Sequence, residues 1–227
     1  MTKTTYKEIN KFMLSQMLDS AHDKYHVYRV LNYALDIASH ECVDDMGVLI
    51  AACLLHDIGR EQQFANPELC HAQVGGEMAH EFLLSIGWES SRAQHVKECI
   101  TSHRYRGNNT PQSIEAEILS DADNLEACGA IGIARTLIYE GQTGEPLYML
   151  GENDGIIEDS RQTKENSFFQ EYNFKLKNVY DKFYTEHGKK LALERQETAT
   201  NFYNGLFAEI NMNNINGMKK HAIILHE

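Results

Sequence analysis

The chain places an unbroken apolar run directly before a histidine and an aspartate, in Val48-Leu49-Ile50-Ala51-Ala52-Cys53-Leu54-Leu55-His56-Asp57-Ile58-Gly59. The run consists mostly of good helix formers, so it predicts a helix that is buried on most sides and ends at Gly59. Such a helix carries an imidazole and a carboxylate into the interior, where burying both without partners costs roughly several kcal/mol. A metal ion would satisfy both groups. The alternative is a neutral histidine beside an aspartate that caps a neighbouring element.

The predicted metal ion needs ligands from other parts of the chain. Adjacent residues of a helix point about 100° apart, so His56 and Asp57 do not share a helix face. They reach one ion only at a loosening helix end, or where the ion lies between several helices. The second arrangement requires donors from neighbouring helices.

The composition is that of an acidic globular protein. The chain has 227 residues, of which 42% are hydrophobic and 24% charged, and its formal net charge is −12. A nucleic-acid partner is not expected, because binding one requires a basic surface. No apolar run approaches the roughly 18 residues of a membrane span, and the polar start of the chain lacks a signal peptide's apolar core. We therefore expect no membrane partner and a cytoplasmic location, which the odd number of scattered cysteines also favours.

The hydrophobic pattern predicts an all-α fold. The three prolines lie in polar or turn-forming surroundings, the segments between them follow a helical period, and no alternating strand-like segment is present. We expect a single domain over residues 1–210, with a helical bundle at about 20–140 and a C-terminal helical pair at about 164–210. Residues 141–163 are predicted to form a long loop, and residues 211–227 a poorly ordered tail.

Two further residues complete a candidate ligand set. His26 lies on a predicted helix whose apolar stripe faces inward, and Asp121 is expected at the end of another helix. With His56 and Asp57 they offer two imidazoles and two carboxylates, a set that suits dications such as Mn, Fe, Co, Ni or Zn. Ligands from three separate helices would leave coordination positions open for water and substrate.

The order and flanks of these residues resemble the HD-domain superfamily of metal-dependent phosphohydrolases. The resemblance rests on three motifs, His22-Asp23-x-x-His26-x-x-Arg29-Val30, Leu54-Leu55-His56-Asp57-Ile58-Gly59 and Ser120-Asp121-Ala122-Asp123-Asn124-Leu125-Glu126-Ala127. It implies an HD-type helical bundle in which His26, His56, Asp57 and Asp121 bind a divalent Mn, Co, Ni, Fe, Mg or Zn ion. The whole pattern is similar to a bacterial subgroup of nucleotide phosphohydrolases and pyrophosphohydrolases. The implied reaction is hydrolysis of a phosphoester or phosphoanhydride in a small nucleotide, such as a nucleoside or deoxynucleoside triphosphate.

Two more histidines resemble those of the HD-GYP branch of the superfamily. His71-x-x-x-Gly75 matches its His-x-x-x-Gly motif, where the histidine helps to hold a second metal, and His103 resembles the next histidine. The branch uses a further histidine where this chain has Arg104, so the resemblance does not extend to a fixed dinuclear centre. We expect Asp57, His71 and His103 to be the catalytic residues, with both histidines near phosphate or water. The alternative is that both histidines bond to backbone at helix ends.

Three arginines are candidates for substrate binding. Arg29 shares a helix face with His26 and is expected to bind phosphate or to pair with a helix carboxylate. Arg104 and Arg106 lie in a polar loop that would grip outer phosphates or simply be solvated. Asp123 is about 200° from Asp121 on a helix, so we expect it to point away from the metal.

Two rival functions and one assembly follow from the same residues. An HD-type di-iron oxygenase would need a second complete metal site. A non-catalytic regulatory protein would hold metal and nucleotide without turnover. The aromatic stripe from Phe168 to Phe183 fits internal packing or the surface of a homodimer.

Overall fold

The computed structural model describes residues 1–17, 23–104, 109–151, 155–159 and 166–225, and within these ranges the fold is all-α, as predicted. The chain forms two compact units. The first comprises Met1–Glu126 and Lys182–Leu191, and the second comprises Ala127–Asp181 and Ala192–Glu227. The expected single domain over residues 1–210 stays a prediction, and each unit is described by itself.

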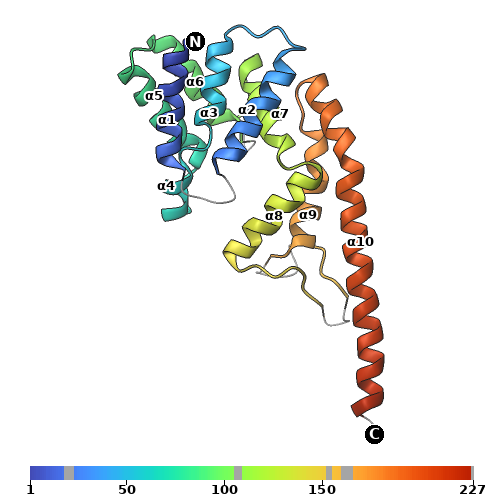
Figure 1. The fold of residues 1–227 in the computed structure, drawn as a ribbon. Coiled ribbons are helices and arrows are strands. Elements are labelled where there is room, and N and C mark those ends of the chain that lie inside the picture. The colour runs from blue at the N-terminus through green and yellow to red at the C-terminus, as the bar shows by residue number, and fades with distance from the viewer. Residues whose placement is uncertain (18–22, 105–108, 152–154, 160–165, 226–227) are drawn as a thin grey trace. The chain divides into compact units, whose positions relative to one another are not determined.

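The first unit is a bundle around one buried helix (Figure 1). Its helices are α1 (Lys3–Gln16), α2 (Lys24–Ala38), α3 (Met46–Leu55), α4 (Arg60–Ala65), α5 (His71–Ser85), α6 (Ser90–Ser102) and α7 (Ile114–Leu125). The apolar run forms α3, which packs against α1, α2, α5, α6 and α7. Because neighbours surround it, its residues from Val48 to Leu55 are buried apart from the half-buried Ile50.

Side-chain caps fix where the two central helices begin. Asp45 precedes α3, and its carboxylate accepts hydrogen bonds from the backbone N–H groups of Gly47 and Val48. The same carboxylate pairs with Arg92 at 2.7 Å. Ser113 caps α7 in the same way by accepting from Ala116. These caps satisfy N–H groups that the first turn of a helix leaves open.

Two glycines allow the end of the apolar run to approach α5 closely. A Cβ on Gly59 would lie 2.3 Å from the carbonyl oxygen of His71 and 2.6 Å from the amide nitrogen of Gly75. A Cβ on Gly75 would lie 3.2 Å from the amide nitrogen of Gly59. Any side chain at Gly59 would therefore separate His71 from the segment that carries Asp57.

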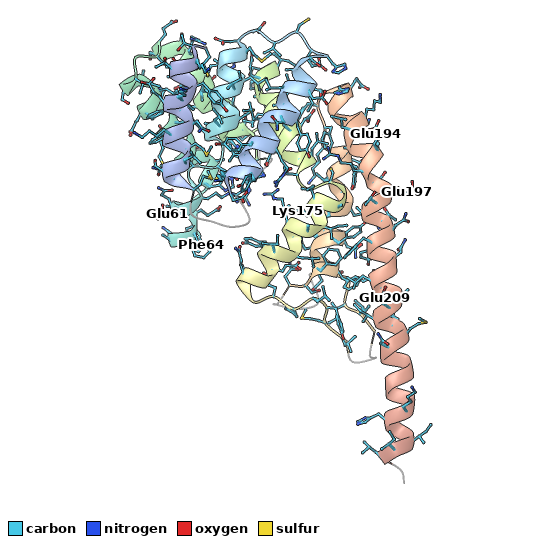
Figure 2. All side chains as sticks on the ribbon, viewed as in Figure 1. Glu61, Phe64, Lys175, Glu194, Glu197 and Glu209 are labelled. Carbon is cyan, nitrogen blue, oxygen red and sulfur yellow. The ribbon has the colours of Figure 1, made fainter. Side chains whose placement is uncertain are left out.

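The second unit contains α8 (Gly129–Thr143), α9 (Phe168–Phe174), the 3₁₀ helix η1 (Leu176–Asp181) and most of α10 (Glu186–Leu225). Its core is built from the predicted aromatic stripe, since Phe168, Phe169 and Tyr172 pack with residues of α8 and α10. Lys175, labelled in Figure 2, follows α9. Its ammonium group pairs with Glu171 at 3.4 Å. Packing thus accounts for these aromatic residues, whereas Phe174 is 71% exposed.

The last helix runs almost to the end of the chain. α10 continues to Leu225, and the expected poor order of residues 211–227 stays a prediction. The segment is rich in asparagine, yet it contains no proline and a single glycine, so nothing in it breaks a helix that has already formed. Acidic side chains such as Glu194, Glu197 and Glu209 line α10 (Figure 2). No helix among the described residues combines the length and the apolar character of a membrane span.

Candidate metal centre

Six side chains from five parts of the first unit converge on one buried place. His26 comes from α2, His56 and Asp57 follow α3, and three more residues come from α5, α6 and α7, namely His71, His103 and Asp123. The first four and His103 are at most 3% exposed, and the side chain of Asp123 is 25% exposed. The structure therefore brings together five of the residues singled out in the sequence, namely His26, His56, Asp57, His71 and His103.

In each of the four histidines of this cluster, a hydrogen bond at Nδ1 fixes the orientation of the imidazole ring. His26 bonds to a carboxylate oxygen of Glu126 at 3.0 Å, and His71 bonds to Oε1 of Gln63 at 2.7 Å. His56 and His103 bond to the backbone carbonyl oxygens three residues before them. An acceptor on Nδ1 requires the proton there, so the neutral rings of His26, His56 and His103 present the lone pair of Nε2. Nδ1 of His71 also lies 3.3 Å from Nη1 of Arg104.

The Nε2 atoms face one another and Asp57. The Nε2 atoms of His26 and His56 are 3.2 Å apart. Oδ2 of Asp57 lies 3.3 Å from Nε2 of His26 and 3.6 Å from Nε2 of His56, while Oδ1 lies 3.4 Å from Nε2 of His71. Two donor groups result, one from His26, His56 and Asp123 and the other from Asp57, His71 and His103. Asp57 borders both groups with different oxygens.

This arrangement fits a divalent cation. Two Nε2 lone pairs at 3.2 Å repel each other, and among the described residues the buried Nε2 atoms of His71 and His103 have no hydrogen-bond partner. Burial lowers the pKa of His56 to about 4 and the pKa of His71 to about 2. Both rings are therefore neutral at pH 7, which is the form that binds a metal. Imidazole and carboxylate donors suit borderline-hard dications.

Asp123, rather than Asp121, belongs to this cluster. Oδ1 of Asp123 lies 3.5 Å from Nε2 of His26 and 3.9 Å from Nε2 of His56. A carboxylate is thus available at the place where the sequence analysis expected Asp121.

Asp121 holds the chain before α10 instead. Its Oδ1 accepts the N–H of Tyr184 at 2.9 Å, and its Oδ2 accepts the N–H and the hydroxyl of Thr185 at 2.8 and 2.7 Å. The carboxylate is fully buried and faces these donors, so the prediction of Asp121 as a metal ligand is corrected. The error arose because α7 does not end at Asp121 but continues to Leu125.

Glu126 is a site residue that the sequence analysis missed. It is fully buried, accepts from His26, and forms a two-pronged pair with Arg29, whose Nε and Nη2 lie 2.9 and 2.8 Å from its oxygens. Arg29 therefore pairs with a helix carboxylate, one of the two alternatives, rather than facing a substrate. The spacing was a usable signal, since residues three apart on a helix, such as Asp123 and Glu126, share a face.

Two other arginines lie beside the half of the cluster that contains Asp57 and His71. Nε of Arg60 donates to Oδ1 of Asp57 at 2.9 Å, and Nη1 of Arg104 lies 3.3 Å from Nδ1 of His71. Arg60 was not singled out in the sequence, although it directly follows Gly59. Arg106, the remaining predicted arginine, lies outside the described residues.

Comparisons with known proteins identify the family of this chain. The HD domain matches residues 24–128. Over 210 residues the chain is 30% identical to the uncharacterised Bacillus subtilis protein YpgQ, covering 90% of this chain and 93% of YpgQ. The crystal structure of YpgQ in complex with ADP has a TM-score of 0.70 at 26% identity, covering 90% of this chain and 97% of that chain. A predicted HD-superfamily hydrolase from an uncultured Thermotogales bacterium has a TM-score of 0.59 at 30% identity, covering 91% of this chain and 92% of that chain. The chain belongs to the HD-domain superfamily.

Proposed function

We propose that this protein is a metal-dependent phosphohydrolase that acts on a small nucleotide, with nucleoside or deoxynucleoside triphosphates as the preferred substrates. The observation that carries the proposal is the convergence of four Nδ1-anchored imidazoles on the carboxylate of Asp57. Such a set of lone pairs is typical of a cation site, and its partly exposed edge at Asp123 leaves access for a ligand.

The protein's own residues divide the work in this proposal. His26, His56, Asp57 and Asp123 would hold the cation, which supplies Lewis acidity by lowering the pKa of a coordinated water and offsetting charge on phosphoryl oxygens. Glu126 keeps the lone pair of His26 directed inward. Asp57 is the proposed proton acceptor, because its two oxygens border both donor groups.

The substrate is inferred from charge. The guanidinium groups of Arg60 and Arg104 lie beside Asp57 and His71, where they are placed to bind phosphate oxygens. The net charge of −12 disfavours a long polyanion, which would meet the whole acidic surface, but a small nucleotide needs only the local positive groups. The crystal structure of YpgQ in complex with ADP supports the proposal that the present protein also binds a nucleotide.

The group formed by Asp57, His71 and His103 raises the question of a second cation. If these histidines serve phosphate, His71→Ala and His103→Ala should lower turnover about 10²-fold or more while leaving the metal content unchanged. If they hold a second cation, each variant should lose one metal equivalent per chain. Two iron ions per chain as isolated, with oxygen consumption, would favour the di-iron oxygenase instead.

A nucleotide screen tests the proposal directly. Purified protein loaded with Mn, Co, Ni or Mg is incubated with nucleoside triphosphates, deoxynucleoside triphosphates and diphosphates, and released phosphate and pyrophosphate are measured separately. We expect turnover with at least one metal and none above background for Asp57→Asn. Nucleotide binding without turnover under every metal would instead support the regulatory protein. Faster hydrolysis of RNA or cyclic dinucleotides than of any mononucleotide would contradict the substrate class.

The two arginines allow a sharper test of the same site. Arg60→Ala and Arg104→Ala should each lower kcat/KM for a triphosphate by about 10-fold or more, because each removes a charged phosphate contact. Lys97→Ala is the matched control, since it removes one positive charge from a pair with Glu77 in the same unit. Equal losses in all three variants would indicate a general charge effect rather than direct phosphate binding.

A further inference from the structure

A second group of metal-type donors lies on the surface of the first unit. Asp36 lies near the end of α2, His40 follows that helix, and His187 lies in the first turn of α10. The side chain of Asp36 is 52% exposed, that of His187 is 16% exposed, and His40 is exposed. This surface triad, Asp36, His40 and His187, takes no part in the chemistry proposed for the buried cluster.

The triad has the geometry of a three-donor site. One ligand atom from each residue lies within 4.8 Å of the other two, and Nε2 of His187 lies 3.2 Å from Oδ2 of Asp36. Metal–ligand bonds of about 2.0–2.2 Å at tetrahedral angles place neighbouring donors about 3.3–3.6 Å apart. The separation of His187 and Asp36 is close to this range, and the exposed side chain of His40 is free of the packing that would prevent it from turning toward the same ion.

The tautomers are also suitable. Nδ1 of His40 lies 3.1 Å from the backbone carbonyl oxygen of Asp36, so its proton points to that acceptor and Nε2 is left with a lone pair. The two imidazole rings stack, with centroids 3.7 Å apart and planes 16° apart. The in-plane lone pairs of stacked rings run parallel, so the exposed His40 ring must rotate out of the stack to share a cation with His187. The cation would replace the proton between His187 and Asp36.

We propose that Asp36, His40 and His187 form a surface site for a borderline transition-metal dication such as Zn²⁺, Ni²⁺ or Cu²⁺. Two imidazoles and one carboxylate are donors that these ions prefer over Mg²⁺ or Ca²⁺. The site is exposed, so the ion exchanges with solvent and water fills the remaining positions. Because the donors come from α2 and from the start of α10, a bound ion links these two segments of the first unit.

Metal stoichiometry tests this proposal without relying on activity. Full-length wild type, His40→Asn and His187→Asn are equilibrated with buffered Zn²⁺, and zinc per chain is measured by elemental analysis across a range of free zinc. We expect each variant to lose one of the zinc equivalents that wild type binds, or to bind it at least about tenfold more weakly. His221→Asn is the matched control, because it removes an exposed histidine from the same helix outside every candidate donor group.

A second readout separates the surface triad from the buried cluster. Cu²⁺ added to the protein after the buried cluster has been filled should give an electron paramagnetic resonance signal with nitrogen coupling in wild type and His221→Asn. The signal should be lost in His40→Asn and His187→Asn, which should keep their catalytic turnover. Unchanged zinc content and an unchanged Cu²⁺ signal in both variants would overturn the proposal.

Discussion

Asp121 and Asp123 lie about 200° apart around α7, and the groups that face them differ in kind. The anchor face, at Asp121, meets two backbone N–H groups and one hydroxyl, all of which donate hydrogen bonds. The ligand face, at Asp123, looks toward the Nε2 atoms of His26 and His56, which accept. A carboxylate among donors is satisfied by the protein alone, whereas a carboxylate among acceptors requires a cation. The balance of donors and acceptors therefore separates the anchoring residue from the ligand.

The largest effect should come from the residue that borders both donor groups. Asp57→Ala removes an oxygen that faces His26 and His56 and another that faces His71, so we expect loss of all bound cation and of turnover. His56→Ala should weaken cation binding by more than the ~10–100-fold that is typical of changing a residue behind a ligand. Elemental analysis of the purified variants measures this, and His80→Ala is a control on α5 outside the candidate groups. If Asp57→Ala keeps a full metal equivalent, the cation does not depend on this cluster. The contrast between the two faces of α7 would then not reflect metal binding.

Removing the cation from the wild type sharpens the same point. A ligand that binds only the folded state stabilises it by about 2.7 kcal/mol at a free concentration of 100 times Kd. Chelation verified by elemental analysis should therefore lower the melting temperature by several degrees. The melting temperature of His56→Ala should not respond to the chelator. An unchanged melting temperature of the wild type would place the cation outside the folded core.

The two faces of α7 predict opposite outcomes for two conservative variants. Asp123→Asn should lose metal affinity and keep the stability of the metal-free protein, since it removes a charge that faces acceptors. Asp121→Asn should keep the metal and lose about 1–3 kcal/mol of stability, because an amide disrupts hydrogen bonds to Tyr184 and Thr185. Metal content and denaturant unfolding of both variants test this. The reverse pattern would restore Asp121 as the ligand.

The contrast on α7 also shows what sequence reasoning reaches. The apolar run before His56 predicted a buried helix, because apolar residues occupy every face of a helix formed by this run. The buried helix α3 confirms the prediction. Asp121 and Asp123 both lie within α7, where helical geometry places them about 200° apart. A single sequence does not say which of two faces turns to the site, because that depends on where Tyr184 and Thr185 lie after folding. Long-range partners of this kind, 63 or 64 residues away, leave no local pattern.

The ordered motif, by contrast, placed His26, His56, Asp57, His71 and His103 in one cluster. The close approach of Gly59 to α5 gives the physical reason why a histidine four residues before Gly75 reaches the site. Glu126 and Gln63 were missed because their role is to hold an imidazole from behind. Such residues are visible only when the distance between two side chains is known.

Glu126 gives a smaller but more specific test of the ligand face. Glu126→Gln keeps the size of the side chain but weakens its acceptance from His26 and Arg29, so metal affinity should fall about tenfold. Arg29→Ala leaves the contact of Glu126 with His26 in place, and its effect on affinity should be smaller. Isothermal titration of the metal-free variants with Mn²⁺ measures both. A larger loss in Arg29→Ala would mean that the arginine, not the carboxylate, positions the imidazole.

The smallest expected effect concerns a third kind of buried carboxyl, in the second unit. Glu140 on α8 is 3% exposed, and among the described residues neither of its carboxyl oxygens has a hydrogen-bond partner. It thus faces neither the N–H donors that Asp121 meets nor the lone pairs that Asp123 meets. Burial, with smaller contributions from Glu145 and Glu171, raises its pKa to about 8 from 4.5, so this carboxyl is protonated at pH 7.

A raised pKa in the folded state fixes the direction of the pH dependence. The contribution of Glu140 to stability is complete below the unfolded pKa of 4.5 and is lost as pH rises through the folded pKa of about 8. Glu140→Gln cannot ionise, so it should match wild type near pH 5 and exceed its stability by about 1–3 kcal/mol at pH 9. Melting temperatures at pH 5, 7 and 9 test this, with the exposed Glu209→Gln on α10 as control. A difference between Glu140→Gln and wild type that does not change with pH would mean that Glu140 is ionised in the folded protein. The donor–acceptor rule drawn from α7 would then fail in the second unit.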